Sequence, residues 1–349
     1  IETNRTKMVQ QKLVKAFQKE IESGAIVENG QIPTFRDLSR RYSCSVTTVK
    51  RMVDDLARLG LLRVIRGRGT FVAGQEKEAV APERSQLIGA IILDDQFLDT
   101  LEQCKDDFLG QGWMFSIYRS TPDAQSPERE RSFLRKAQEL AFSAIVIEAS
   151  PIAPVNTDFF RRMRSDGMKV IHLSPYIDDM SAECAFLPDF RSAGLLAAVK
   201  AALAGYESIT FFPADSRAPF SRLVDAGIRQ IAGEIPLAVL ENAPATRDPE
   251  AVRAFLRTVP RRTAVVCLDS EMGSCTIRCA QEEGMEIRKD FGVVSIMESP
   301  GDKSTHSFMT FDFEKITRDA LNFAIDRNRS PFEAVCHCYP AHFCDLNTL

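Results

Sequence analysis

The sequence predicts an α/β protein with a small N-terminal head followed by a much larger body of parallel sheets covered by helices. In residues 32–72, two helical patterns are separated by a tight polar turn and are followed by two short strands. From residue 87 onward, apolar strand-like runs alternate with amphipathic helical stretches, which is typical of parallel sheets. The polar, charged segment GQEKEAVAPERSQ separates the two parts. We therefore expect a head over residues 1–74, a linker over 75–86 and a body over 87–349.

The head contains the order of elements that makes a winged helix-turn-helix. Thr34 is placed to cap a helix over Phe35–Tyr42, and Ser45 to cap a second helix over Val46–Leu59. Strands are expected at Leu61–Ile65 and Thr70–Ala73, joined by the basic turn Arg66-Gly67-Arg68-Gly69. In the second helix, apolar residues recur at three- and four-residue steps, which predicts a core stripe of Val49, Met52, Val53, Leu56 and Leu59. The alternative is another small α+β domain with a basic hairpin.

Hydroxyl and basic side chains lie off that stripe, near the start of the second helix. A recognition helix presents this end to the major groove, where such groups contact base edges and phosphates. Charge supports the same interpretation, because residues 1–74 hold 14 Lys+Arg against 7 Asp+Glu, whereas the remainder holds 30 against 41. A basic head on an acidic body makes double-stranded DNA the expected partner.

The segments IPTFRDLSRRY, SVTTVKRMVDDLARLGLL and GRGTFV give the head a resemblance to the GntR family of winged-helix regulators. The resemblance covers about residues 5–74. It implies a phosphate contact by Arg36 and wing contacts by Arg68 and Gly69. On the recognition helix it implies contacts by Ser45, Thr47, Thr48 and Lys50. Val46 stands where members often have a cation, so either a base contact is missing there or an apolar contact to a thymine methyl replaces it.

The body alternates strands and helices throughout. Strands are expected at Leu87–Leu93, Met114–Tyr118, Ala144–Ile147, Lys169–Leu173, Ser208–Phe212, Leu237–Leu240, Ala264–Leu268 and Gly292–Ile296. Helices are expected at Phe97–Leu109, Pro127–Leu140, Asp158–Ser165, Arg191–Ala204, Phe220–Ala232, Pro249–Thr258, Glu271–Glu283 and Glu314–Ile325. Strands that are apolar along their whole length are typical of burial on both faces, and ligands of such folds bind at the carboxyl ends of the strands.

Three segments of the body resemble the sensor domain of the lactose-repressor (LacI) family. They are ECAFLPDFRSAGLLAAVKAALAGYESITFF, SRLVDAGIRQI and AVVCLDSEMGSCTIRCAQEEGMEIRKDFGVVSIME. The resemblance spans about residues 86–345 and implies a periplasmic-binding-protein-like fold with two Rossmann-like lobes around a cleft. It places the first lobe at about 87–203 and 305–328, and the second at about 204–304 and 329–349.

The same resemblance implies an effector site between the lobes. Arg222 matches an arginine that commonly faces the cleft, and Asp189 matches an aspartate near the lobe junction. Asp269 and Glu298 depart from the usual Asn and Asp at their positions. An arginine opposite carboxylates, with aromatic rings nearby, suits a sugar or another polyol. The aromatic candidates, which follow strands or open helices, are Phe97, Tyr176, Phe190 and Phe220. Core packing of these rings is the alternative, as is a structural pairing of Arg222 with Asp225 or Asp189.

The nine cysteines fit no disulfide framework, and a reduced compartment is expected. The run Cys336-His337-Cys338 with His342 and Cys344 suggests a metal site, but buried thiols are the preferred interpretation, as they are for Cys267, Cys275 and Cys279. Trp113 is expected in the core. No cofactor or metal is expected, because no GxGxxG follows a predicted strand, no P-loop is present and the four histidines show no catalytic spacing.

The expected function is a ligand-responsive transcription regulator that reads a palindromic operator as a homodimer. The two family resemblances imply a repressor. A small molecule, a sugar or sugar derivative, would bind the cleft. No apolar run reaches the length of a membrane span and no export signal precedes the head, so the expected location is the cytoplasm without membrane contact. The alternatives are a sugar-binding module without DNA activity and, further away, an enzyme on Rossmann-like lobes.

Overall fold

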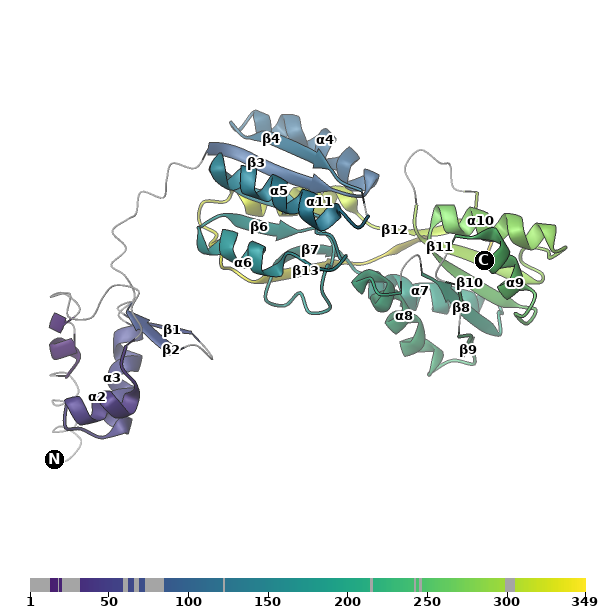
Figure 1. The fold of residues 1–349 in the computed structure, drawn as a ribbon. Coiled ribbons are helices and arrows are strands. Elements are labelled where there is room, and N and C mark those ends of the chain that lie inside the picture. Colours follow the sequence, from purple (N-terminus) through teal and green to yellow (C-terminus); the bar gives the residue numbers. More distant parts are fainter. Residues whose placement is uncertain are drawn as a thin grey trace. The chain divides into compact units, whose positions relative to one another are not determined.

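The computed structural model describes residues 13–17, 19–20, 32–58, 62–65, 69–72, 85–121, 123–213, 216–241, 243–244, 247–298 and 305–349. The chain divides into two compact units, Ile1–Glu83 and Arg84–Leu349. Both are drawn in Figure 1 and are described separately below. No helix among the described residues combines the length and the apolar character that crossing a lipid bilayer requires.

The first unit has the elements of a winged helix-turn-helix. They are α2 (Phe35–Arg41), α3 (Val46–Arg58), β1 (Leu62–Ile65) and β2 (Gly69–Val72), with β1 and β2 paired antiparallel. Thr34 caps α2 by accepting from the Asp37 N–H, and the Ser45 hydroxyl accepts from the Thr48 N–H at 3.1 Å. Both caps were expected, and each element lies within one residue of its predicted bounds.

The predicted stripe of α3 forms the core of this unit. Val49, Met52, Val53 and Leu56 are at most 1% exposed and pack with Leu38 of α2. Leu13 and Phe17, from the helical residues 13–17, complete the same cluster. The last predicted member, Leu59, lies outside the described residues.

The second unit contains two six-stranded sheets with helices on both faces. The first sheet has the order β13-β7-β6-β5-β3-β4 and is parallel throughout; the second has the order β14-β12-β11-β10-β8-β9, with only β14 antiparallel to its neighbour. The strands are β3 (Ser85–Ile92), β4 (Met114–Arg119), β5 (Phe142–Ile147), β6 (Lys169–His172), β7 (Cys184–Pro188), β8 (Ser208–Phe212), β9 (Ala238–Val239), β10 (Thr263–Asp269), β11 (Phe291–Met297), β12 (Ser307–Thr310), β13 (Val335–Tyr339) and β14 (His342–Cys344).

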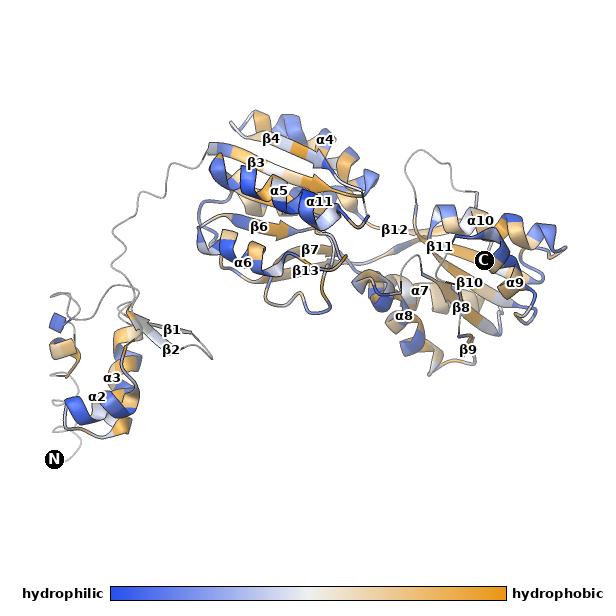
Figure 2. Cartoon of the chain, in the orientation of Figure 1, coloured by the Kyte–Doolittle hydropathy of each residue, from blue (hydrophilic) through white to orange (hydrophobic). Residues whose placement is uncertain are grey.

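Each sheet and its helices make one lobe. The helices of the first lobe are α4 (Asp95–Leu109), α5 (Ser126–Glu139), α6 (Thr157–Ser165) and α11 (Phe313–Ile325); those of the second are α7 (Phe190–Leu203), α8 (Pro219–Ala232), α9 (Pro249–Leu256) and α10 (Ser270–Glu282). In the first lobe α4 and α11 cover one face and α5 and α6 the other; in the second, α7 and α8 lie opposite α9 and α10. Figure 2 shows the strands mostly hydrophobic and the helices two-sided, as burial of both sheet faces requires.

The lobes have different limits from those expected, because the chain crosses between them elsewhere. It leaves the first lobe at Asp189, returns after Phe311 and leaves again at Pro340. The second lobe contains two segments that were expected in the first, residues 190–203 and 307–310. The first sheet has as its edge strand a segment that was expected in the second lobe, residues 335–339. A hydrogen bond joins the first and third crossings, because the Asp189 N–H donates to the Tyr339 carbonyl at 2.8 Å.

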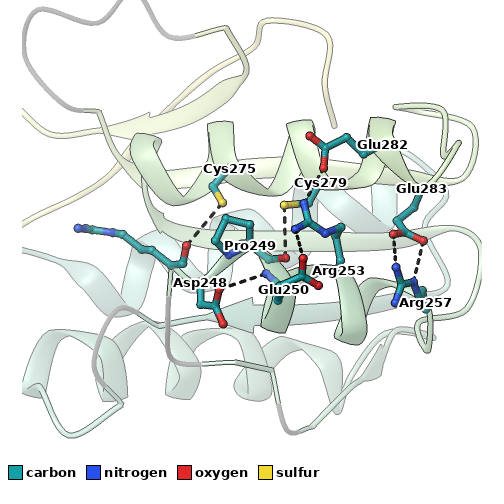
Figure 3. Close-up of polar contacts among 10 residues, drawn as sticks. Asp248, Pro249, Glu250, Arg253, Arg257, Cys275, Cys279, Glu282 and Glu283 are labelled. Atoms are coloured by element: carbon teal, nitrogen blue, oxygen red, sulfur yellow. Dashed lines mark hydrogen bonds and ion pairs between the residues drawn. The ribbon is translucent and has the colours of Figure 1, made fainter.

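The cysteine prediction is correct for one group and wrong for another. Cys275 and Cys279 are buried in α10, where their thiols face the carbonyls of Arg247 and Pro249 (Figure 3). Cys336 and Cys338, which were expected to be buried, are exposed on β13, the edge strand of the first sheet. Trp113 lies in the core just before β4.

Helices α7 and α8 touch through their backbones at two glycines. A Cβ atom on Gly194 would lie 2.1 Å from the Val224 carbonyl oxygen, and one on Gly227 would lie 2.1 Å from the Arg191 carbonyl oxygen. Neither neighbour is a side chain that can rotate away. Any larger residue at either position must therefore push the two helices apart.

We expect Gly227→Ala to destabilise the protein, because the methyl group overlaps backbone; overpacking of this kind costs about 1–3 kcal/mol. Urea unfolding measures the loss. Gly233→Ala is the matched control, since its Cβ would meet nothing closer than 3.9 Å. Equal unfolding midpoints for Gly227→Ala and the unmodified chain would contradict the close contact.

Candidate functional site

The start of α3 presents a row of exposed side chains. Val46 is 45% exposed, and Thr47, Lys50 and Arg51 are exposed beside it. The first turn of this helix contains no acidic residue. The first turn can therefore meet polyanionic DNA without a carboxylate of its own.

The other predicted DNA contacts have different positions. Ser45 and Thr48 share a hydrogen bond of 2.8 Å between their hydroxyls, so both serve the helix cap as well as the surface. Arg36 is exposed on α2, and Gly69 begins β2. Arg68 lies outside the described residues. The structure therefore groups the α3 residues on one surface and places Arg36 on the neighbouring helix.

In the second unit, two polar contacts join the carboxyl ends of the two sheets. The side-chain amide of Gln96, at the start of α4, donates to the Glu298 carbonyl just after β11. The guanidinium of Arg222, on α8, pairs with Asp178 from the loop after β6. Residues beyond the carboxyl ends of both sheets thus face one another, and we call this region the cleft.

Arg222 does not pair with either predicted partner. Its contact is Asp178, 44 residues away in the sequence and in the other lobe, and it also donates to the Arg217 carbonyl. The arginine is 44% exposed. It therefore reaches from the second lobe to a carboxylate of the first.

Two of the three predicted carboxylates cap helices, while Glu298 lies just after β11. Asp189 accepts from the Ser192 N–H at the start of α7, and Asp269 accepts from the Met272 N–H at the start of α10. Asp269 also pairs with Arg247, which reaches Glu271 at 3.1 Å. These aspartates therefore stabilise the starts of α7 and α10.

Three of the predicted aromatic residues belong to a chain of rings that passes beside the crossings between the lobes, a region that we call the hinge. Phe97 packs on Phe313 with ring centroids 4.9 Å apart, and Phe311 lies 5.9 Å from Phe313. Phe190 lies 5.5 Å from Phe311 and 5.8 Å from Phe220. Phe97 and Phe190 are at most 3% exposed, so they pack in the core that the lobes share.

Tyr176 is buried in the first lobe, away from the hinge rings. Its ring stacks on that of His172, with the two ring centroids 4.7 Å apart, and contacts the ring of Phe160 edge-on. Burial lowers the pKa of His172 to about 3, so this imidazole is neutral. The structure therefore gives Tyr176 a packing role.

Sequence reasoning missed a buried carboxyl group at the cleft, Glu148. It follows β5 and accepts from the N–H groups of Leu93 and Asp94 at 2.7 and 2.8 Å, just before α4. Burial, followed by the nearby carboxylate of Asp94, raises the pKa of Glu148 to about 8. The available signal was an acidic residue after the apolar run 144–147. Within the described part of the chain, no three His, Cys, Asp or Glu side chains are grouped to hold a metal ion.

These features define a winged-helix head with an exposed recognition helix, joined to a two-lobed body with a polar cleft. Residues 9–72 match the family model described as bacterial regulatory proteins, gntR family. The chain is also similar to an arabinose metabolism transcriptional repressor of Geobacillus stearothermophilus. The two are 23% identical over 283 residues, which cover 78% of this chain and 77% of that protein.

Solved structures show the fold of the body. One is a Cra transcriptional dual regulator from Pseudomonas putida in complex with fructose 1-phosphate, with TM-score 0.60 and 16% identity, covering 75% of this chain and 99% of that one. Another is a LacI family transcriptional regulator from Enterococcus faecium with bound ribose, with TM-score 0.57 and 17% identity, covering 75% and 98%. The two-lobed periplasmic-binding-protein-like fold of the body is confirmed, and the family model confirms the resemblance of the head to the gntR family.

Glu148 predicts a specific dependence of stability on pH. Its folded pKa of about 8 lies above its ordinary value of 4.5, so the folded state holds a proton that the unfolded state releases between these values. The contribution of this proton to the free energy of unfolding is complete below pH 4.5 and is lost as pH rises through about 8. We expect the melting temperature of the unmodified chain to fall relative to that of Glu148→Gln across this range, by about 2–4 °C for each kcal/mol.

Differential scanning calorimetry at several pH values measures the two slopes. A constant offset between the proteins reports only the substitution itself, so the difference in slope is the test. Glu128→Gln, at an exposed position on α5, is the control and should keep the slope of the unmodified chain. Parallel curves for Glu148→Gln and the unmodified chain would contradict the raised pKa.

Proposed function

We propose that the chain is a DNA-binding transcription regulator, a repressor of carbohydrate-related genes, whose operator affinity changes when an effector binds the cleft. One observation carries this proposal. A head that matches the gntR family of regulators and exposes the start of α3 is joined to a body with the fold of LacI-family regulators. Neither part alone would give a ligand-dependent switch.

The names of similar proteins support a regulator of sugar metabolism. The Geobacillus relative is named an arabinose metabolism repressor, and a second relative is named a transcriptional repressor, NagR, of Bacillus subtilis. These relatives are named as repressors and not as enzymes. We include three further points in the proposal: the effector is a sugar or sugar derivative, the regulated genes serve carbohydrate metabolism, and the protein acts in the cytoplasm.

On the DNA side, we assign the base and phosphate contacts to the exposed row of α3 and to the wing. Thr47, Thr48 and Lys50 contact the major groove, Arg36 a phosphate, and Arg68 with Gly69 the backbone or the neighbouring groove. Val46, exposed at the same end, supplies an apolar contact to a thymine methyl. A homodimer would place two heads on the two halves of a palindromic operator.

On the effector side, the polar candidates face the cleft and the aromatic ones support it. Asp269 ends β10, Glu298 follows β11, and Arg222 lies in the first turn of α8. Asp189 lies at a crossing between the lobes. The buried rings of Phe97, Tyr176 and Phe190 act through packing, while Phe220 is half-buried at the start of α8. Closure of the lobes around the effector would change the relative placement of the heads.

We expect Lys50→Ala to weaken operator binding, because the exposed ammonium group is lost where base edges and phosphates are contacted. A lost base contact costs about 1–3 kcal/mol, roughly 5- to 150-fold in affinity. A lost phosphate contact should also reduce the salt slope by about one. Fluorescence anisotropy with an operator selected from random DNA by the purified protein measures both quantities.

Lys136→Ala, an exposed lysine on α5 paired with Glu139, is the control and should bind as the unmodified chain does. Unchanged affinity of Lys50→Ala would remove α3 from the DNA interface. If no DNA is selected at all, the chain is instead a binding module without regulatory activity.

A further inference from the structure

The second lobe contains a cavity of about 400 Å³ between α8 and the carboxyl ends of β8 and β9. We call it the α8 cavity. Its polar lining includes Ser221, Arg222, Asp225, Arg229 and Glu241, and its apolar lining includes Phe211, Ile228 and Val239. Because Arg222 also reaches Asp178 of the first lobe, the cavity lies beside the cleft. Its size suits a small-molecule ligand.

Both arginines of the α8 cavity are already paired with carboxylates. Arg229 donates to both oxygens of Glu241, at 2.6 and 2.9 Å, and to Asp225 at 2.6 Å. Arg222 holds Asp178. Two guanidinium groups thus face three carboxylates, and the described lining of the cavity offers no unpaired cation.

This arrangement disfavours an anionic ligand through the charges that would remain. Each pair is partly exposed and is worth at most about 1 kcal/mol, so breaking one is not the main cost. The main cost is that a phosphate which took Arg229 would lie beside the released carboxylates of Glu241 and Asp225. Like charges that close repel even when solvent screens them.

Elsewhere in the cleft, arginine side chains are likewise paired with carboxylates. Arg119 pairs with Asp95, and Arg247 pairs with Asp269 and Glu271. Among the described cleft residues, the arginines with known contacts are matched or outnumbered by carboxylates. A phosphate or carboxylate ligand would therefore meet paired arginines at these positions too.

A buried hydroxyl in the cavity wall points to a ligand rich in hydroxyl groups. Ser221 is 1% exposed, and its Oγ has no hydrogen-bond partner in the described structure. Paired arginines and carboxylates beside it offer fixed donors and acceptors, both of which a hydroxyl can use. Phe211, Ile228 and Val239 offer the apolar surface that the carbon face of a sugar ring covers.

We infer that the α8 cavity is a subsite for the effector and that it selects an uncharged polyhydroxylated molecule over its phosphorylated or carboxylated forms. This inference rests on the proposed function and specifies its ligand class. Ser221 contacts a ligand hydroxyl, and Glu241 together with Asp225 holds Arg229 so that it rejects an added anion.

Calorimetric titration of the full chain with matched sugars tests the selection. The probes are arabinose, ribose and fructose, each against a phosphate ester of the same sugar. We expect the uncharged member of a pair to bind at least about tenfold more tightly, a difference of 1.4 kcal/mol. Ser221→Ala should weaken that binding several-fold. Ser165→Ala, at an exposed hydroxyl on α6, is its control.

Removal of a carboxylate tests the cause of the selection. Glu241→Gln should narrow the preference for the uncharged sugar, because the phosphate ester then meets one negative charge fewer. Glu283→Gln is the matched control, since Glu283 forms the same two-bond pair with Arg257 at the far end of α9 (Figure 3). An unchanged preference in Glu241→Gln would overturn the assigned role of the pair.

The outcomes separate this inference from the proposed function. Tighter binding of a phosphate ester by the unmodified chain, with release of operator DNA, overturns the inference and leaves the regulator intact. If no sugar of either kind binds or alters operator binding, the proposed carbohydrate function itself fails. Preference for the uncharged sugar with a normal response in Ser221→Ala would place the ligand outside the α8 cavity.

Discussion

The arrangement of the cleft depends on the backbone contact between α7 and α8. Gly194 and Gly227 let each helix approach the carbonyl groups of the other, which fixes the rotation of α8 about its axis. That rotation turns Ser221, Arg222 and Arg229 toward the α8 cavity and turns Val224 toward the core. Since α7 begins immediately after the first crossing, the contact also ties the ligand-facing helix to the hinge.

The hinge itself is held by apolar contacts, and the cleft by polar ones. Each aromatic pair in the chain from Phe97 to Phe220 contributes about 0.5–1.5 kcal/mol beyond its buried area. The exposed pair between Arg222 and Asp178 contributes at most about 1 kcal/mol. Movement of the lobes would therefore break the polar contacts and keep the ring chain. This also explains why Phe97 and Phe190, which were predicted to contact a ligand, are buried. Their rings pack in the core that the two lobes share beside the crossings.

The sequence was sufficient for features that depend on near neighbours. The caps at Thr34 and Ser45, the stripe of α3 and most helices and strands of the body follow from local spacing, and the structure confirms them. Features set by distant pairing were missed or wrong. The strands β7 and β12 and the lobe limits depend on which strands meet in a sheet, and Asp178, the partner of Arg222, lies 44 residues away. The altered pKa of Glu148 arises from burial by segments far away in the chain, which its neighbours in the sequence do not indicate.

An uncharged effector limits how the cleft can act on the head. Such a ligand gains little from long-range attraction, so its preference for one arrangement of the lobes must come from hydrogen bonds that form only when both sides of the cleft are within reach. A coupling of about 1–3 kcal/mol is typical of allosteric proteins, and a hydrogen bond contributes about 0.5–1.5 kcal/mol. Two or three such bonds between the lobes through the ligand are therefore enough. Gln96 and Arg222 already reach across the cleft, so groups able to form these bonds are in place on both sides before any ligand enters.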